Sequence, residues 1–201
     1  MYNEYKYLDP DYEYTDRNTG VLRNRAGIAN QQDLDFFESA AVTKRVKELA
    51  DNPLPIKNSK SLFVLHKYMF QDVYEWAGER RTVEISKKGN HFFPTNYFDT
   101  ALVFIDTLIA DYRKRDPHDK GELSGKLAAI LDAVNHLHPF REGNGRTQRE
   151  FIRTLALEKG LLLNLNPPDN PRVYERYMTG TIDGNVEELS SLIFDLLSES
   201  G

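Results

Sequence analysis

Twelve consecutive residues, from His138 to Arg149, carry the side chains of this chain that are best suited to chemistry. Their sequence is HPFREGNGRTQR, which holds one histidine, one carboxylate, two glycines flanking an asparagine and, after them, two arginines. Stability alone rarely needs a base, an acid, flexible backbone and fixed positive charge in so short a stretch. The combination indicates a site that moves a phosphate-containing group.

The glycine-rich centre of this segment predicts an anion cradle. Gly143, Asn144 and Gly145 can adopt backbone angles closed to bulkier residues, so that successive N–H groups can point at one anion. A helix is expected to begin here, and its positive end favours the same charge. His138 precedes a proline, which disfavours helical geometry at that position. We therefore expect the preceding helix to end at His138 and to project the imidazole into the loop.

The charges beside the cradle support an anionic ligand. Arg146 and Arg149 are three residues apart and share one face of the first helical turn. Cations at a helix start cost about 0.3–1 kcal/mol each, and a bound anion reverses that sign. Arg153 continues the stripe, but we interpret it as a surface partner of Glu150. Glu142 would repel a phosphate unless Mg²⁺ bridges them, and one carboxylate with phosphate oxygens is a usual magnesium environment.

The composition is that of an ordinary globular domain. The chain has 201 residues, of which 40% are hydrophobic and 28% charged, enough for one sizeable core. A net charge of −5 disfavours general nucleic-acid binding. The absence of cysteine excludes disulfides, thiolate metal sites and cysteine nucleophiles. No apolar stretch approaches the ~20 residues of a membrane span, and the polar N-terminus is no Sec signal peptide. Export by a route that reads other signals stays open.

Apolar periodicity predicts a mostly helical fold with one β-hairpin. Residues 1–30 lack this periodicity and are interpreted as an extended, tyrosine-rich arm. The alternation at 82–93, around a turn at 86–90, predicts the hairpin. We expect Trp76 in the core and His66 as a hydrogen-bonded core histidine. Helices are expected at about 31–52, 59–70, 100–112, 123–136, 144–159, 173–178 and 185–197.

The segment from His138 to Arg149 resembles the signature of the Fic family. That signature is His-Pro-Phe, any residue, Asp or Glu, Gly-Asn-Gly-Arg, any two residues, Arg, and every fixed position is met. The flanking helices, the hairpin and the segment 76–78 also resemble the family. The resemblance implies a mostly α, Fic-type helical bundle with a short β-hairpin flap over the active site. Residues 31–201 would form the catalytic domain, and residues 1–30 the arm.

The resemblance implies a protein adenylyltransferase, which transfers AMP from ATP to a Tyr, Thr or Ser hydroxyl of a target protein and releases pyrophosphate. His138 would be the general base, and Glu142 would hold Mg²⁺. Phe140 would anchor the loop in the core. The base pocket is expected around residues 177–185. The residues implied to bind the nucleotide are Gly143, Asn144, Gly145, Arg146, Gln148, Arg149 and Tyr177.

The hairpin is the expected docking flap for the target. An extended target segment could add to its open strand edge, which gives main-chain register with little demand on sequence. Lys87 and Lys88 at the tip would help to clamp phosphate or target, or they form a solvated turn. The docking residues are Ile85, Ser86, Lys87, Lys88 and Gly89.

Regulation is expected to come from outside this sequence. Many relatives carry an inhibitory helix of the form Ser or Thr, three residues, Glu, then Gly or Asn. The one Glu followed by Gly or Asn here is Glu142, and His138 stands four residues before it. A separate inhibitory antitoxin would then restrain a toxin in the bacterial cytoplasm. Alternatively, the chain is the catalytic part of an effector that is secreted into a host cell.

Other activities on the same scaffold are alternatives. UMP, phosphate or phosphocholine transfer would use the same site, but the phosphate-transferring variant has a lysine where Gly145 stands. A nucleotide-binding interaction module without catalysis is the third interpretation, and the intact His138 argues against it, because a pure binder has no use for a base there.

Overall fold

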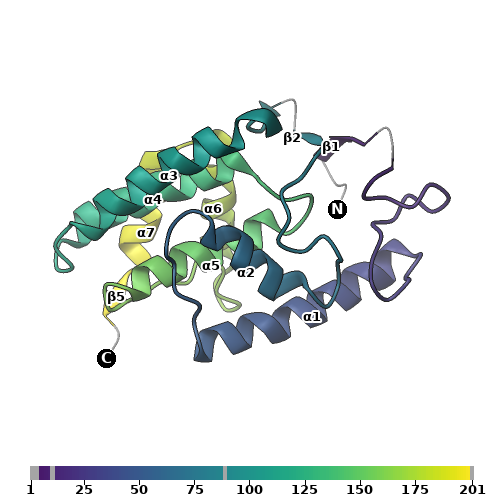
Figure 1. Cartoon of the computed structure of the whole chain (residues 1–201). Coiled ribbons are helices and arrows are strands. Elements are labelled where there is room, and N and C mark those ends of the chain that lie inside the picture. Colours follow the sequence, from purple (N-terminus) through teal and green to yellow (C-terminus); the bar gives the residue numbers. More distant parts are fainter. Residues whose placement is uncertain (1–4, 10–11, 88–89, 200–201) are drawn as a thin grey trace. The chain divides into compact units, whose positions relative to one another are not determined.

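The computed structural model describes residues 5–9, 12–87 and 90–199 (Figure 1). Helices dominate this part of the chain, as the sequence predicted. The helices are α1 (Gln31–Asp51), α2 (Ser61–Phe70), α3 (Phe98–Arg113), α4 (Lys120–Leu137), α5 (Asn144–Leu157), α6 (Pro171–Asp183) and α7 (Val186–Leu196), with a 3₁₀ turn at Thr95–Tyr97. The strands are β1 (Tyr5–Leu8), β2 (Glu84–Lys87), β3 (Asn90–His91), β4 (Leu161–Leu162) and β5 (Ser198–Glu199). Among the described residues, no helix is both long and apolar enough to cross a membrane.

The chain forms two compact units. Of the described residues, the first contains those within 1–54, 62–98 and 137–147, and the second contains those within 55–61, 99–136 and 148–201. Helix α5 begins in the first unit and continues into the second. The division into an arm at 1–30 and a catalytic domain at 31–201 stays a prediction.

The first unit is organised by α1 and α2. The side chain of Asn30 caps α1 by accepting from the N–H groups of Gln32 and Asp33, which satisfies donors that a helix start leaves unpaired. Helix α1 ends just before Asn52, near the predicted position. Its buried face carries Leu34, Val42 and Leu49, and α2 adds the fully buried Leu62, Leu65, Met69 and Phe70.

The predicted hairpin is present, but it belongs to a three-stranded antiparallel sheet. Strand β2 pairs with β3 on one side and with β1 on the other, in the order β1-β2-β3. Figure 1 shows β1 beside β2. The open edge expected on β2 is therefore filled by the chain's own N-terminal strand. Ile85 is 2% exposed, so it faces the interior; Lys88 and Gly89 lie outside the described residues.

The second unit is built from α3, α4, α6, α7 and most of α5. Helix α6 runs from Pro171 to Asp183, which is longer than the predicted 173–178. A Cβ at Gly180 would lie 2.7 Å from the side chain of Leu189 on α7, so the glycine permits close packing of these two helices. Gly184 ends α6 in the left-handed conformation (φ 62°), the geometry that glycine adopts most readily.

Two expectations about aromatic residues of the first unit had different outcomes. His66 is a fully buried, hydrogen-bonded histidine, as expected. The expectation that Trp76 lies in the core was wrong. Its indole is half-buried, stacks on Tyr74 with ring centroids 4.2 Å apart, and lines a cavity.

Candidate active site

His138 sits at a sharp change of backbone direction in the first unit. Helix α4 ends at Leu137, and His138 has a φ of 45°. The backbone of a residue other than glycine is strained by roughly 1 kcal/mol or more in this left-handed region, so surrounding contacts must hold His138 there. The helix end that the proline predicted is confirmed. His138 is buried, with 5% of the residue exposed.

Arg81 supplies much of that hold. Its N–H donates to the carbonyl of Pro139 (2.7 Å), and its Nε donates to the carbonyl of His138 (2.8 Å). Its two terminal nitrogens donate to the carbonyls of Val83 and Phe93, each at 2.6 Å. Arg81 is only 1% exposed, and this burial lowers the pKa of its guanidinium. One buried cation thus ties the loop at residues 138–139 to both ends of the hairpin.

The flap also contacts the imidazole itself. The ring of Phe92, just after β3, stacks on the ring of His138 with centroids 3.7 Å apart and planes at 16°. This contact limits the ring orientations that His138 can adopt.

The cradle differs in detail from the predicted one. Gly143 has a φ of 80°, and a Cβ there would lie 2.3–2.9 Å from ring atoms of Phe70, so only glycine fits. Gly145 is already inside α5 and has no special backbone angle. The Asn144 amide bridges the loop: it accepts from the N–H of Phe140 (2.9 Å) and donates to the carbonyl of the same residue (2.7 Å). Phe140 is 1% exposed, as its predicted anchoring role requires.

Glu142 follows on the same loop and is half-buried. Its Oε1 accepts from the N–H of Gly143 at 2.9 Å, whereas its Oε2 has no hydrogen-bond partner among the described residues. Burial, and after it the charge of Glu38, raise the pKa of this carboxyl.

The main chain at Glu142 is held by His66, whose Nδ1 accepts from the N–H of Gly78 (2.8 Å). The proton must therefore be on Nε2, which donates to the carbonyl of Glu142 (3.0 Å).

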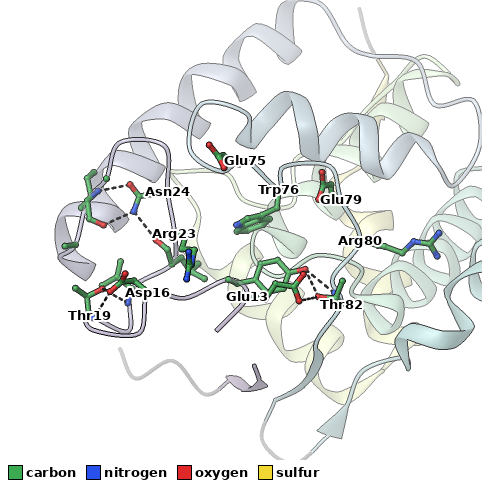
Figure 2. A pocket seen from close by; sticks show the side chains of 16 residues that line it. Glu13, Asp16, Thr19, Arg23, Asn24, Glu75, Trp76, Glu79, Arg80 and Thr82 are labelled. Atoms are coloured by element: carbon green, nitrogen blue, oxygen red, sulfur yellow. Dashed lines mark hydrogen bonds between the residues drawn. The ribbon is translucent and has the colours of Figure 1, made fainter. Parts of the chain in front are cut away.

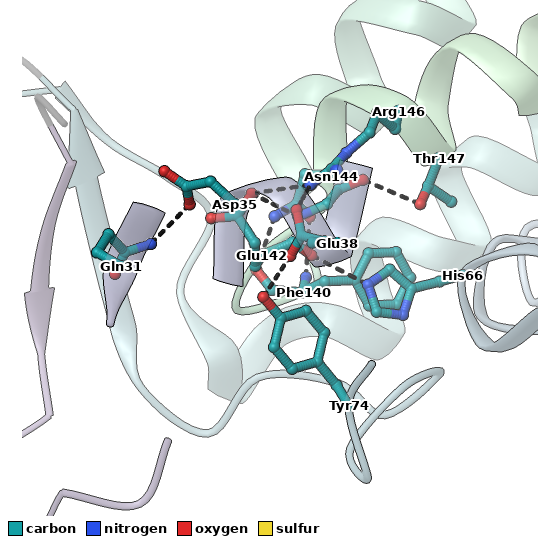
Figure 3. A network of polar contacts seen from close by, with 11 residues as sticks. Gln31, Asp35, Glu38, His66, Tyr74, Phe140, Glu142, Asn144, Arg146 and Thr147 are labelled. Carbon is teal, nitrogen blue, oxygen red and sulfur yellow. Dashed lines mark hydrogen bonds and ion pairs between the residues drawn. The ribbon is translucent and has the colours of Figure 1, made fainter. Parts of the chain in front are cut away.

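Arg146 points into a network that the sequence did not suggest (Figure 3). Its Nη2 lies 2.5 Å from Oε1 of Glu38 on α1 and 3.5 Å from Oε1 of Glu142. The guanidinium lies over the ring of Phe70, 4.7 Å from its centroid. Burial opposes ionisation of Arg146, but the two carboxylates outweigh it and raise its pKa. The hydroxyl of Tyr74 donates to the other carboxylate oxygen of Glu38, Oε2.

The remaining predicted nucleotide residues lie in the second unit. The guanidinium of Arg149 is 5.4 and 5.2 Å from the ring centroids of Tyr174 and Tyr177. Gln148 donates to the hydroxyl of Tyr177, and both residues are buried, at 2% and 1% exposed. Arg153 pairs with Glu150 at 2.7 Å, as interpreted from the sequence, but Glu150 is buried (5% exposed), so the expectation of a surface pair was wrong.

Four residues that shape the site were missed in the sequence, namely Glu38, Tyr74, Arg81 and Phe92. Each lies far from the motif along the chain; Glu38 and Arg146, for example, are 108 residues apart. The segments that contain Glu38 and Tyr74 were interpreted only from their apolar residues. No neighbouring motif indicated a role for these two side chains in the site.

A separate cavity of about 620 Å³ lies in the first unit (Figure 2). It is formed by the segments 13–29 and 75–82, with Trp76 at its centre. None of the predicted site residues lines it. Its rim carries acidic and basic side chains, and several of these are already engaged locally; Asp16, for example, accepts from Asn18 and Thr19.

The helical scaffold carries a histidine and a carboxylate on one loop, His138 and Glu142, and an arginine, Arg146, in the first turn of the helix that follows. The Fic/DOC family model matches residues 57–156, and the chain belongs to this family. It is 34% identical over 180 residues to the probable protein adenylyltransferase y4lH of Sinorhizobium fredii, covering 87% of this chain and 90% of that protein. It is 37% identical over 199 residues to the protein adenylyltransferase VbhT of Bartonella schoenbuchensis, covering 96% of this chain.

The chain spans 41% of the length of VbhT. Among solved structures, the BepC protein of Bartonella tribocorum with bound AMPPNP superposes with a TM-score of 0.81 at 22% identity. That match covers 94% of this chain and 98% of the other. At this identity the likeness establishes the shared fold.

Proposed function

We propose that this chain is a protein adenylyltransferase, which transfers AMP from ATP to a hydroxyl side chain of a target protein. One observation carries the proposal: His138 and Glu142 share one short loop whose backbone is fixed from several sides, and Arg146 stands in the first turn of the helix that follows. The names of y4lH and VbhT, and the AMPPNP bound to BepC, support the same activity.

The chemistry follows from the residue types. The target hydroxyl oxygen attacks the α-phosphorus of ATP, the bond to the bridging oxygen breaks, and pyrophosphate leaves. The hydroxyl proton passes to the imidazole of His138, because histidine is the side chain that titrates near neutral pH. Negative charge grows on the leaving group, where fixed donors and cations stabilise it most. Arg146 and the cradle at 143–145 supply them.

Arg149 is proposed to contact the terminal phosphates of the nucleotide. The two tyrosine rings beside it restrict its guanidinium, and cation–aromatic contacts of this kind contribute about 0.5–2 kcal/mol. Gln148 and Tyr177 are proposed to support the nucleotide site through this arginine, since both side chains are buried. The adenine pocket remains a prediction for the residues near 177–185.

Glu142 is suited to hold Mg²⁺. Its Oε2 has no hydrogen-bond partner among the described residues, and no group of three or more His, Cys, Asp or Glu among them could hold a metal. A single carboxylate fits Mg²⁺, which takes its remaining ligands from water and substrate phosphates. When bound, Mg²⁺ would neutralise phosphate charge beside a carboxylate that otherwise repels it.

The target is proposed to dock along the flap. Strand addition remains the simplest mode, but β1 fills one edge of β2. A target strand would therefore displace β1, or add to the outer edge of β1 or β3. The docking contribution of Ser86, Lys87, Lys88 and Gly89 remains part of this proposal.

A separate inhibitory protein and the place of action are also proposed. BepC is described as a VirB-translocated Bartonella effector, which favours secretion into a host cell. The expected absence of the inhibitory helix motif instead fits a cytoplasmic toxin with an antitoxin. Growth of a bacterial host that expresses this chain, alone or with a co-expressed small helical partner, separates the two: only a toxin arrests growth when alone.

The test is labelling with ATP that carries the label at the α- or the γ-phosphate, in lysate with Mg²⁺, beside the His138→Ala variant. Protein bands labelled only from the α-position, and lost in the variant, would establish AMP transfer. Labelling from the γ-position would mean phosphate transfer, which Gly145 disfavours. Labelled UTP in the same assay tests UMP transfer. Nucleotide binding without labelling from any donor would favour the interaction module.

A further inference from the structure

Glu38 on α1 is the closest charged partner of the first motif arginine. Its Oε1 lies 2.5 Å from Nη2 of Arg146, and the two side chains are 12% and 29% exposed. Charge-assisted hydrogen bonds at this distance are among the stronger polar contacts in proteins. The pair is partly sheltered from water, so its electrostatic attraction is screened less than that of a surface pair. The contact is therefore strong enough to decide where the guanidinium points.

Glu38 is itself held in place. The hydroxyl of Tyr74 donates to its second oxygen, Oε2. Burial, and after it the charge of Glu38, raise the pKa of Tyr74, so this hydroxyl stays protonated and remains a donor. The ring of Tyr74 is 2% exposed and stacks on Trp76 with centroids 4.2 Å apart. Figure 3 shows Tyr74 and Arg146 converging on the Glu38 carboxylate.

The contact with Glu38 uses only one nitrogen of the Arg146 guanidinium, Nη2. Both hydrogen bonds of Arg146 to described residues, to Glu38 and to Glu142, use Nη2. Its Nε and Nη1 have no hydrogen-bond partner among the described residues. One face of the guanidinium is covered by Phe70. Arginine carries five donors in a planar fork, so fixing one corner and one face orients the remaining donors without using them up.

We propose that Glu38, held by Tyr74, is a positioning residue that orients Arg146 toward the phosphates of the bound nucleotide. This rests on the proposed function for its catalytic consequence, but the orienting itself does not depend on it. The opposite role for a carboxylate at this place is competition with phosphate for Arg146, which would weaken nucleotide binding. The two roles predict changes of opposite sign when Glu38 is removed.

The chain offers a matched control on the same helix. Glu48 on α1 also pairs with an arginine, Arg45 (3.0 Å), and also accepts from a tyrosine hydroxyl, that of Tyr68 (2.9 Å). Among the described residues, this second carboxylate–arginine–tyrosine set makes no hydrogen bond, ion pair or ring contact with residues 138–145. Glu48→Ala and Tyr68→Phe therefore remove the same chemistry at a place where it should not affect the reaction.

The first experiment needs no catalysis. Side-chain ¹⁵N–¹H NMR spectra report whether a guanidinium rotates freely, and Arg146→Lys assigns the Arg146 signals by their loss. We expect slow rotation with separate Nη–H signals in the parent and in Glu48→Ala, and averaged signals in Glu38→Ala. Slow rotation that persists unchanged in Glu38→Ala would overturn the proposal, whatever reaction the chain performs.

The second experiment separates kcat from KM for ATP. Glu38→Ala should lower kcat by about 10-fold or more and change KM by less than about 3-fold, because an oriented arginine matters most as charge develops on the leaving group. Glu38→Gln keeps the shape and an acceptor, so we expect it to recover part of kcat, and Tyr74→Phe should cause a smaller loss. In an Arg146→Ala background, Glu38→Ala should cause no further loss.

Two results would overturn the proposal in an active enzyme. A rise in activity or tighter ATP binding in Glu38→Ala would make Glu38 a competitor of phosphate. An equal loss with and without Arg146, or an equal loss in Glu48→Ala, would mean a general structural role. Absence of AMP transfer by the parent would refute the proposed function alone, because the NMR comparison would still decide the position of Arg146. If Glu38→Ala does not fold, Glu38→Gln and Tyr74→Phe serve for both experiments.

Discussion

The ring of Phe92 in the flap lies parallel to the imidazole of His138, with centroids 3.7 Å apart and planes at 16°. The stack couples the flap to the proposed general base. Proton transfer depends on the direction of the accepting nitrogen, so a contact that fixes the ring plane bears directly on rate.

Phe92→Ala is expected to lower kcat for AMP transfer by about 10-fold, because the imidazole gains orientations that are not productive. Phe92→Tyr keeps the ring and should stay near the parent. Phe36→Ala is the control, since Phe36 is 79% exposed on α1. The measurement is steady-state incorporation of α-labelled ATP. An unchanged kcat in Phe92→Ala would show that His138 is oriented by other contacts.

Arg81→Lys is expected to reduce the free energy of unfolding by roughly 2–4 kcal/mol, because it leaves buried carbonyl groups without donors. The guanidinium of Arg81 donates to the carbonyls of His138, Val83 and Phe93, and an ammonium lacks the planar fork to reach all three. Urea unfolding at neutral pH measures the change. Arg45→Lys, in an ion pair with Asp72, should cost no more than about 1 kcal/mol; equal costs for both variants would contradict the account.

Gly143→Ala should destabilise the loop because two penalties add. The residue has a φ of 80°, and the new Cβ would meet the ring of the buried Phe70. Gly27→Ala separates the penalties, because Gly27 has a φ of 66° but open space around it. We expect about 1 kcal/mol for Gly27→Ala and about 2–4 kcal/mol, with impaired nucleotide binding, for Gly143→Ala. Thermal unfolding with and without ATP is the measurement, and equal losses would mean that Phe70 yields.

Stability should fall as the pH drops below about 6.5 because of His66. Burial lowers the pKa of His66 to about 3 in the folded protein, from an ordinary 6.5. Between those values the unfolded chain binds a proton that the folded chain does not. The contribution is complete above pH 6.5 and is lost toward pH 3, at about 1.4 kcal/mol per pH unit. Urea unfolding from pH 7 to 4 measures the slope, which should flatten in His66→Gln but not in His118→Gln, an exposed site. A slope equal in all three proteins would rule out His66 as its source.

Removal of residues 1–8 is expected to raise labelling of a target protein several-fold if the target pairs with β2. The reason is that β1 occupies that edge, with Lys6 opposite Ser86 and Leu8 opposite Glu84. Lys6→Pro is a milder test, since proline cannot donate to a strand pair. Unchanged labelling in both variants would mean that the target uses another edge. Labelling of small-molecule acceptors serves as the control for intrinsic activity.

Many of the helices and of the proposed site residues could be predicted from the local sequence. The proposed site residues His138, Glu142 and Arg146 lie within nine consecutive residues, so the sequence alone suggests their joint chemistry. Pro139 predicts the end of α4. The apolar repeat places α1 and α4 within a few residues of their observed ends, because each helix buries one face and the repeat records that face. Helix α6 was underestimated because its glycine reflects close packing against α7, which the local pattern does not contain.

Tertiary structure decided how the loop is held and aimed. Glu38 reaches Arg146 across 108 residues, and Arg81 reaches His138 across 57. Such contacts depend on which helix face and which strand edge meet, and a single buried polar side chain leaves no periodic trace in the sequence. The pairing of β1 with β2 is hidden for the same reason: an edge accepts any extended segment through its backbone, so side-chain types in the arm do not reveal it. The chain's own sequence therefore determined which groups are proposed to react, and folding determined their orientation.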